Sequence, residues 1–230
     1  MNHASVCRTA FLLTAAVCLT ACGNAGSPLA ATAQRAGVAL PKASLAQAAN
    51  ATQTLAPLEG ALTANRVLAF AHAAAKQVDA KAAFTGLSGN WIGTDGEPTD
   101  KGTWTVQYLG SDLAPPKGVK NPYGNKLTRR IAISVDGKGI PTVTVTEVAG
   151  LPLGLAYLES PLPELDSSDV LRLVRKERPA AAQHPIERMS LTVHPRDFQV
   201  MLWKVGTTTQ SSDRPLTINA NTGAIVTTPY

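Results

Sequence analysis

The sequence predicts an α+β fold in which helices pack on one face of an antiparallel sheet. Two segments, 63–78 and 169–177, repeat apolar residues at intervals of three and four, the period of an amphipathic helix. Several other segments alternate apolar and polar residues, as half-buried strands do. A helix followed by three or four strands occurs twice. We therefore expect two pseudo-repeated lobes, at 61–150 and 151–230, either separate or merged into one sheet.

The first lobe begins with the helix of residues 63–78, for which Thr63 is a candidate N-cap. Its apolar stripe comprises Val67, Phe70, Ala71, Ala74 and Val78, whereas His72, Lys76 and Asp79 fall on the opposite side. Residues 102–110 alternate strictly and predict a strand, with 84–95 as its partner. Residues 129–148 predict a hairpin that turns at the sequence Asp-Gly-Lys-Gly.

The second lobe repeats this order. Residues 169–177 predict a short helix that Asp166, Ser167 or Ser168 caps and Pro179 ends. Strands follow around residues 189–193, 198–202, 216–220 and 224–228. The stretch 198–205 is apolar in both phases, so Met201 and Trp203 fall on the face opposite Phe198 and Leu202. They either meet a second layer or form an exposed patch.

A family resemblance covers residues 166–228. The helix at 169–177, the strands "MSLTVH" and "FQVMLWKV", and the hairpin "NANTGAIV" at 219–226 resemble a PepSY-type domain. Gly223 suits a turn position with positive φ, and Asn219 stands where that family often has Asp. The resemblance implies a helix packed on a curved antiparallel sheet, in proteins that are often exported and that bind or inhibit other proteins.

The N-terminus predicts export. Arg8 precedes the uncharged apolar run 10–21, which is shorter than the about 20 residues that a bilayer span needs. Leu19-Thr20-Ala21-Cys22 resembles the lipobox of bacterial lipoproteins. The resemblance implies a signal peptide at 1–21 and a lipid on Cys22. Since Gly23 stands where an inner-membrane-retaining Asp occurs, it also implies the outer membrane of a Gram-negative bacterium.

Composition agrees with a tethered domain. Residues 22–60 hold few charges and predict a flexible tether between membrane and fold. The three cysteines are Cys7, Cys18 and Cys22, so cleavage before Cys22 leaves one thiol and no internal disulfide.

Other functional classes lack their signatures. Removing Arg8 with the signal leaves 20 basic residues against 16 acidic ones and no dense basic run, so we expect no nucleic-acid partner. We also expect no metal and no cofactor, because His72, His184 and His194 lack ligand spacing and no nucleotide loop is present. No nucleophile elbow occurs either, and we expect a protein that is not an enzyme.

Two features suggest a binding role. The strand faces opposite the apolar stripes are rich in Thr, Ser and Arg, with Arg130 and Thr144 among them, and such a face lies in water when helices cover only the other one. Met201 and Trp203 are the second candidate, because Met and Trp are enriched at interfaces. We therefore expect an envelope lipoprotein that binds a protein or peptide, as an inhibitor or assembly factor. The alternative is a lipid or glycan carrier with a cavity between sheet and helices.

Overall fold

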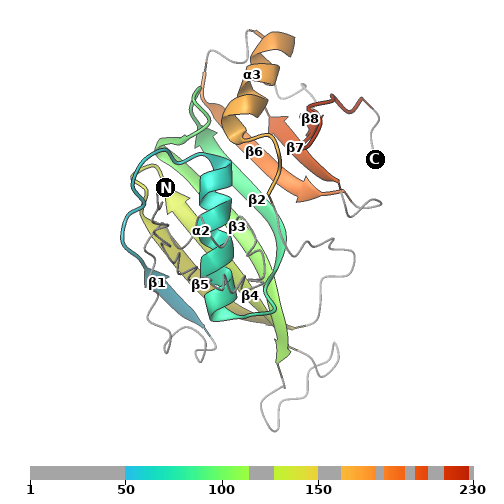
Figure 1. Ribbon diagram of the computed structural model, residues 1–230. Helices are drawn as coiled ribbons and strands as arrows, with labels where there is room; N and C mark the ends of the chain where they lie inside the picture. Colours follow the sequence, from blue (N-terminus) through green and yellow to red (C-terminus); the bar gives the residue numbers. More distant parts are fainter. Residues whose placement is uncertain are drawn as a thin grey trace, which may run out of the picture.

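The computed structural model describes residues 50–113, 127–149, 162–179, 184–194, 200–206 and 215–227. Within them the chain forms one eight-stranded antiparallel sheet and two helices (Figure 1). The elements are β1 (Ala51–Thr54), α2 (Ala64–Val78), β2 (Ala83–Ile92), β3 (Pro98–Leu113), β4 (Leu127–Asp136), β5 (Pro141–Ala149), α3 (Ser167–Glu177), β6 (Ile186–Val193), β7 (Met201–Gly206) and β8 (Leu216–Asn219). The α+β class is therefore confirmed.

The sheet is continuous across the boundary that the sequence predicts between two lobes. Its strand order is β1-β5-β4-β3-β2-β6-β7-β8, so β2 of the first segment pairs directly with β6 of the second. The register runs from Gly86 opposite Thr192 to Ile92 opposite Ile186. The two segments thus share a single sheet.

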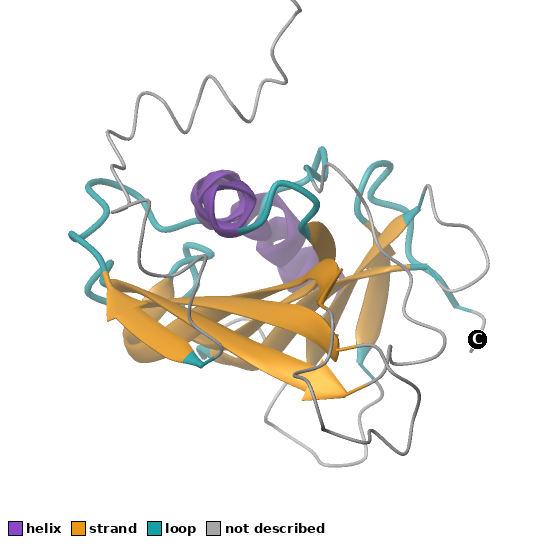
Figure 2. Cartoon of the chain, turned by 90° about the horizontal axis from the view of Figure 1, so that it is seen from below, coloured by secondary structure: helices purple, strands orange, loops and turns teal. Residues whose placement is uncertain are grey.

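Both helices cover the same face of this sheet. In Figure 2, which views the molecule from below Figure 1, α2 and α3 lie on one side and the other side carries no described helix. All five residues of the predicted α2 stripe are buried, as are Val170, Leu171 and Val174 of α3. They join alternate residues of all strands but β1 in one hydrophobic cluster. Burial of apolar area at about 25 cal/mol per Å² makes this layer the main source of stability.

Two tryptophans occupy the centre of the core. The indole of Trp104 in β3 donates from Nε1 to Leu62 O at 2.9 Å, and that of Trp203 in β7 donates to Leu165 O at 3.1 Å. Their ring centroids are 6.4 Å apart at an interplanar angle of 60°. Each buried indole N–H is therefore satisfied by a carbonyl just before a helix.

The structure places the residues 201 and 203 in this core. Met201 is 4% exposed and Trp203 is 0% exposed. Of the two alternatives for this stretch, the structure therefore shows packing against a second layer and not an exposed patch. The reason is the register of β7, which directs residues 201, 203 and 205 to the helices while Leu202, on the opposite face, is also buried. Neither Met201 nor Trp203 offers a surface to a partner here.

The N-termini of the two helices share their caps. The backbone N–H of Ala64 donates to Ser167 Oγ at 3.0 Å, and that of Asn65 donates to Asp166 Oδ1 at 2.9 Å. Asp166 also caps α3, in a capping box with Asp169. Thr63 occupies the N-cap position as predicted, but its side chain makes no capping hydrogen bond. The orphan N–H groups of α2 are satisfied instead from the neighbouring helix.

The described chain begins within the segment predicted as a tether. Residues 51–54, within the range 22–60 predicted as tether, form β1 and pair with β5, and Leu58 N donates to Gly139 O at 2.8 Å. The signal peptide at 1–21 and Cys22 lie outside the described residues. Neither α2 nor α3 has the length and hydrophobicity of a membrane-spanning helix.

The predicted turn at 219–223 is confirmed. Gly223 has a φ of 73°, and Asn219 Oδ1 accepts hydrogen bonds from the N–H groups of Asn221 and Thr222. Of the strand predicted at 224–228, the described residues show a single bridge, between Ile225 and Ile218.

Candidate binding site

The sheet face opposite the helices, hereafter the open face, is lined by small hydroxyl side chains. Seven of them form one row, hereafter the hydroxyl row, which crosses all eight strands with Lys204 at the β7 position: Thr54, Thr142, Ser134, Thr105, Ser88, Ser190, Lys204 and Thr217. Neighbouring hydroxyls lie 3.1 Å apart for Thr105 and Ser134. Thr144 and Arg130, both predicted for this face, lie on it, and the Arg130 guanidinium donates to Gln107 Oε1 at 2.7 Å.

One aromatic side chain interrupts this polar surface. Trp91 of β2 is 46% exposed, and Ile225 is the other exposed large hydrophobic among the described residues. Trp91 has a φ of 52°, which makes it the single non-glycine residue with positive φ in the described part of the chain. This conformation costs an L-residue about 1–2 kcal/mol. Strain of this kind persists where the surrounding structure enforces it, often at functional sites.

A break in strand register enforces the conformation. Asn90 pairs with Thr103 and Ile92 with Pro98, so two steps along β2 correspond to five along β3. Gly102 lies inside this irregularity, where an added Cβ would meet Trp91 O at 2.4 Å and Asn90 O at 2.9 Å. The close backbone approach therefore requires glycine at 102, and it turns Trp91 away from the core that its neighbours Gly89 and Ile92 face.

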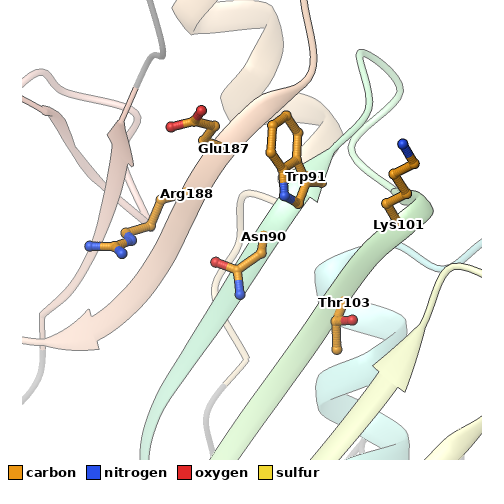
Figure 3. A pocket seen from close by; sticks show the side chains of 6 residues that line it. All are labelled: Asn90, Trp91, Lys101, Thr103, Glu187 and Arg188. Atoms are coloured by element: carbon orange, nitrogen blue, oxygen red, sulfur yellow. The ribbon is translucent and has the colours of Figure 1, made fainter. Parts of the chain in front are cut away.

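Trp91 forms part of a surface hollow of about 380 Å³ (Figure 3). The lining of this Trp91 hollow consists of Asn90, Trp91, Lys101, Thr103, Glu187 and Arg188. These residues come from three adjacent strands, β3, β2 and β6, at the middle of the sheet. In Figure 3 the indole lies between Glu187 on β6 and Lys101 on β3. The site therefore combines one flat apolar ring with two cations, a carboxylate, an amide and a hydroxyl.

The Trp91 hollow escapes prediction from the sequence. Leu87 and Gly89 face the core, so strict alternation predicts that residue 91 faces the core as well. The register break between Asn90 and Ile92 prevents this, and no local sequence pattern reveals that break. The available signal is a tryptophan next to Asn90 and before Gly93, in a strand whose partner carries the glycine at 102.

A second polar cluster lies at the end of α2. Asp79 accepts hydrogen bonds from Ser111 N at 2.7 Å, Ser111 Oγ at 2.9 Å and Lys81 N at 2.9 Å, and Arg129 Nη1 lies 3.9 Å from its carboxylate. Burial raises the pKa of Asp79, but these hydrogen bonds and the charge of Arg129 outweigh it, so the pKa lies below its ordinary value. The carboxylate thus ties the helix end to β3 and β4.

His72 and Tyr108 meet between α2 and the sheet. Their ring centroids are 6.0 Å apart, and Tyr108 is fully buried. His72, predicted on the polar side of its helix, is half-buried because its ring lies against that of Tyr108. Burial, and secondarily Lys76, lowers the pKa of His72, and burial raises the pKa of Tyr108. Both side chains are therefore neutral at pH 7.

The described residues include no group of three or more His, Cys, Asp or Glu side chains that could hold a metal ion. His72 Nδ1 and Tyr108 Oη are both buried, and neither atom has a hydrogen-bond partner within the described residues. This pair belongs to the packed layer, whereas the Trp91 hollow opens to solvent.

Comparisons with protein-family models, curated proteins and solved structures find no match to this chain. The structure is therefore a helix-covered antiparallel sheet with a polar open face and an exposed tryptophan in a surface hollow. The lipobox at Leu19–Cys22 and the PepSY-type resemblance stay predictions.

Proposed function

We propose that this chain is a non-catalytic, lipid-anchored envelope protein that binds a partner on the open face of its sheet, with the Trp91 hollow as the anchor. The observation that carries this function is Trp91 itself. A large aromatic ring stands half in water, in a backbone conformation that costs free energy, and Gly102 maintains that conformation. Packing alone gives no reason for a tryptophan there.

Surface binding is favoured over the carrier alternative. The space between helices and sheet is filled by one cluster in which Leu68, Trp104, Ile131 and Trp203 are all fully buried. A carrier needs a cavity that encloses its ligand. The Trp91 hollow lies outside this layer.

Two partner classes remain for this surface. A protein or peptide partner, the sequence expectation, is supported by Trp91 and Arg188, because Trp and Arg dominate the binding energy of protein interfaces. A glycan is supported by the polar lining of the hollow.

The proposed location follows from the N-terminus. Cleavage before Cys22 and acylation of its thiol would anchor the chain, and stable anchoring requires more than one acyl chain. The outer membrane of a Gram-negative bacterium is the proposed site, on the strength of Gly23. Mass spectrometry of the mature chain tests this directly. A free thiol, or an N-terminus elsewhere, would remove the basis for a membrane location.

The two-lobe repeat is likewise a proposal. Each lobe would consist of a helix and the strands after it, related about the β2–β6 pair. The matching hydrogen bonds from Trp104 to Leu62 O and from Trp203 to Leu165 O support it, because both link the second strand of a lobe to the residue two places before its helix. The PepSY-type resemblance would then apply to the second lobe.

Site-directed photo-cross-linking tests the binding face. Lys204→Cys places a benzophenone maleimide on the open face, and Lys176→Cys places it on the exposed side of α3. We expect cross-linked adducts with envelope components from the probe at residue 204 and none from the probe at residue 176. An excess of unlabelled wild-type protein should prevent these adducts, whereas an excess of unlabelled Trp91→Gly should not. Equal adducts from both positions, or equal competition by the variant, would refute binding through this face.

A further inference from the structure

We infer that the Trp91 hollow binds a pyranose ring that bears a carboxylate, as one unit of an anionic polysaccharide. This inference rests on the proposed function and names the chemistry of its partner. Its support comes from the shape of the lining, from the donors and acceptors in it and from the charge of the open face.

The aromatic ring is matched to a ligand with one apolar face. A pyranose presents axial C–H groups on one side of its ring and hydroxyls around its rim, so it stacks on a single indole and needs no apolar walls. The five lining residues besides Trp91 are all polar. An apolar peptide side chain would lie against amide, hydroxyl and charged groups there, and burial next to unpaired polar groups is unfavourable.

The rim of the hollow offers both donors and acceptors. Asn90 and Thr103 do both, Lys101 and Arg188 donate, and the Glu187 carboxylate accepts. Sugar hydroxyls also donate and accept, so each lining group finds a complement. The Glu187 carboxylate can accept a hydrogen bond from a sugar hydroxyl, which leaves Lys101 and Arg188 for the carboxylate of the same sugar.

The two cations select an acidic sugar. Lys101 on β3 and Arg188 on β6 border the hollow, and within the described residues neither side chain has a hydrogen bond or an ion pair. Arg130 and Lys204 add two more cations to the open face. The chain without residues 1–21 has 20 basic residues against 16 acidic ones. This balance attracts an anionic polymer, and a planar guanidinium binds a carboxylate in two hydrogen bonds.

Neighbouring units of the polymer would lie on the hydroxyl row. Thr105, Ser88 and Ser190 follow the hollow on the same three strands, one step further along the sheet. Strands lie about 4.8 Å apart, so hydroxyls recur at that interval across the face. A polysaccharide can therefore exchange hydrogen bonds with this row without meeting an apolar patch.

Tryptophan fluorescence provides the test. The described structure buries Trp104 and Trp203, so quenching by acrylamide reports on Trp91. The probes are oligogalacturonate, oligoalginate and hyaluronate oligomers, each compared with its methyl-ester form, which keeps the rings and removes the charge. We expect at least one acidic oligomer to shield Trp91, and its methyl ester to bind about tenfold more weakly, as the loss of a charge-assisted hydrogen bond predicts.

Matched variants locate the site. Arg188→Gln should weaken binding of the acidic oligomer about tenfold and bring it close to the affinity for the methyl ester. Arg175→Gln, an exposed arginine of α3, should leave the affinity unchanged. Trp91→Gly should abolish binding when measured by calorimetry, and a thermal melt confirms that this variant is folded.

Three results would overturn the inference: equal binding of acid and ester, equal loss from Arg175→Gln and Arg188→Gln, or no binding by any acidic oligomer. If cross-linking from residue 204 then yields a protein adduct that Trp91→Gly fails to compete away, the proposed function stands and the sugar ligand is wrong. If neither experiment shows binding at the open face, both are wrong.

Discussion

The backbone of Trp91 gives a direct test of whether the hollow is a strained, maintained feature. Trp91→Ala and Trp91→Gly both remove the indole, but alanine keeps the penalty of a φ near 52° and glycine does not. Relief of that penalty is worth about 1–2 kcal/mol. The larger entropy of unfolded glycine offsets about 0.5–1 kcal/mol of it. The glycine variant should therefore be more stable than the alanine variant by roughly 1 kcal/mol.

Urea denaturation followed by fluorescence measures this difference, since both variants retain Trp104 and Trp203 as reporters of the core. In a thermal melt, a difference of about 1 kcal/mol corresponds to about 2–4 °C for a chain of this size. Both variants should lose ligand binding equally, because both lack the indole ring that would contact the ligand. An alanine variant as stable as the glycine variant would show that residue 91 is not held in the left-handed region.

Other perturbations test the packing and the two polar clusters. Gly89→Ala would place a Cβ 2.3 Å from Trp104 Cζ3, so we expect a loss of about 1–3 kcal/mol in thermal denaturation and an altered near-ultraviolet circular dichroism spectrum; an unchanged melt would contradict the contact. Ser167→Ala removes the acceptor of the first N–H of α2 and should cost about 1–2 kcal/mol in urea unfolding, whereas Ser168→Ala, at a half-buried neighbour whose hydroxyl makes no hydrogen bond within the described residues, should cost less. The pKa values of His72 and Asp79 are both lowered by folding, so stability should be full above pH 6.5, fall first as His72 protonates below 6.5, and fall again as Asp79 protonates below about 3.8. His72→Gln should flatten the first decline of the urea midpoint, and an unchanged profile would refute the role of that side chain.

The helices and most strands follow from local pattern. α2 and α3 were predictable because each has a single amphipathic stripe, and α3 also has its own capping residue, Asp166. The strands of the β4–β5 hairpin were predictable because strict alternation and the turn at 136–139 agree. Local pattern does not determine which strand of one segment meets a strand of the other, so the pairing of β2 with β6 came only from the structure.

Where the sequence is ambiguous, the reason is physical. Residues 198–205 are apolar in both phases, so alternation could not decide which face of β7 packs on the helices. Thr63 has the composition of a cap, yet the caps of α2 come from residues about a hundred positions later. The orientation of Trp91 depends on a register break in the partner strand and on the glycine at 102. Long-range contacts of this kind leave no trace in a local window.

Because β2 pairs with β6, each half of the molecule would expose an unpaired strand edge without the other half. A fragment ending at residue 149 would leave the long strand β2 as a bare edge, and such edges recruit further strands and lead to aggregation or strand exchange. The Trp91 hollow spans this seam, with Lys101 contributed from one half and Arg188 from the other. A ligand that contacts both Lys101 and Arg188 would link the two halves of the sheet. Its binding would therefore stabilise the entire sheet against unfolding, and not only the strands that it contacts.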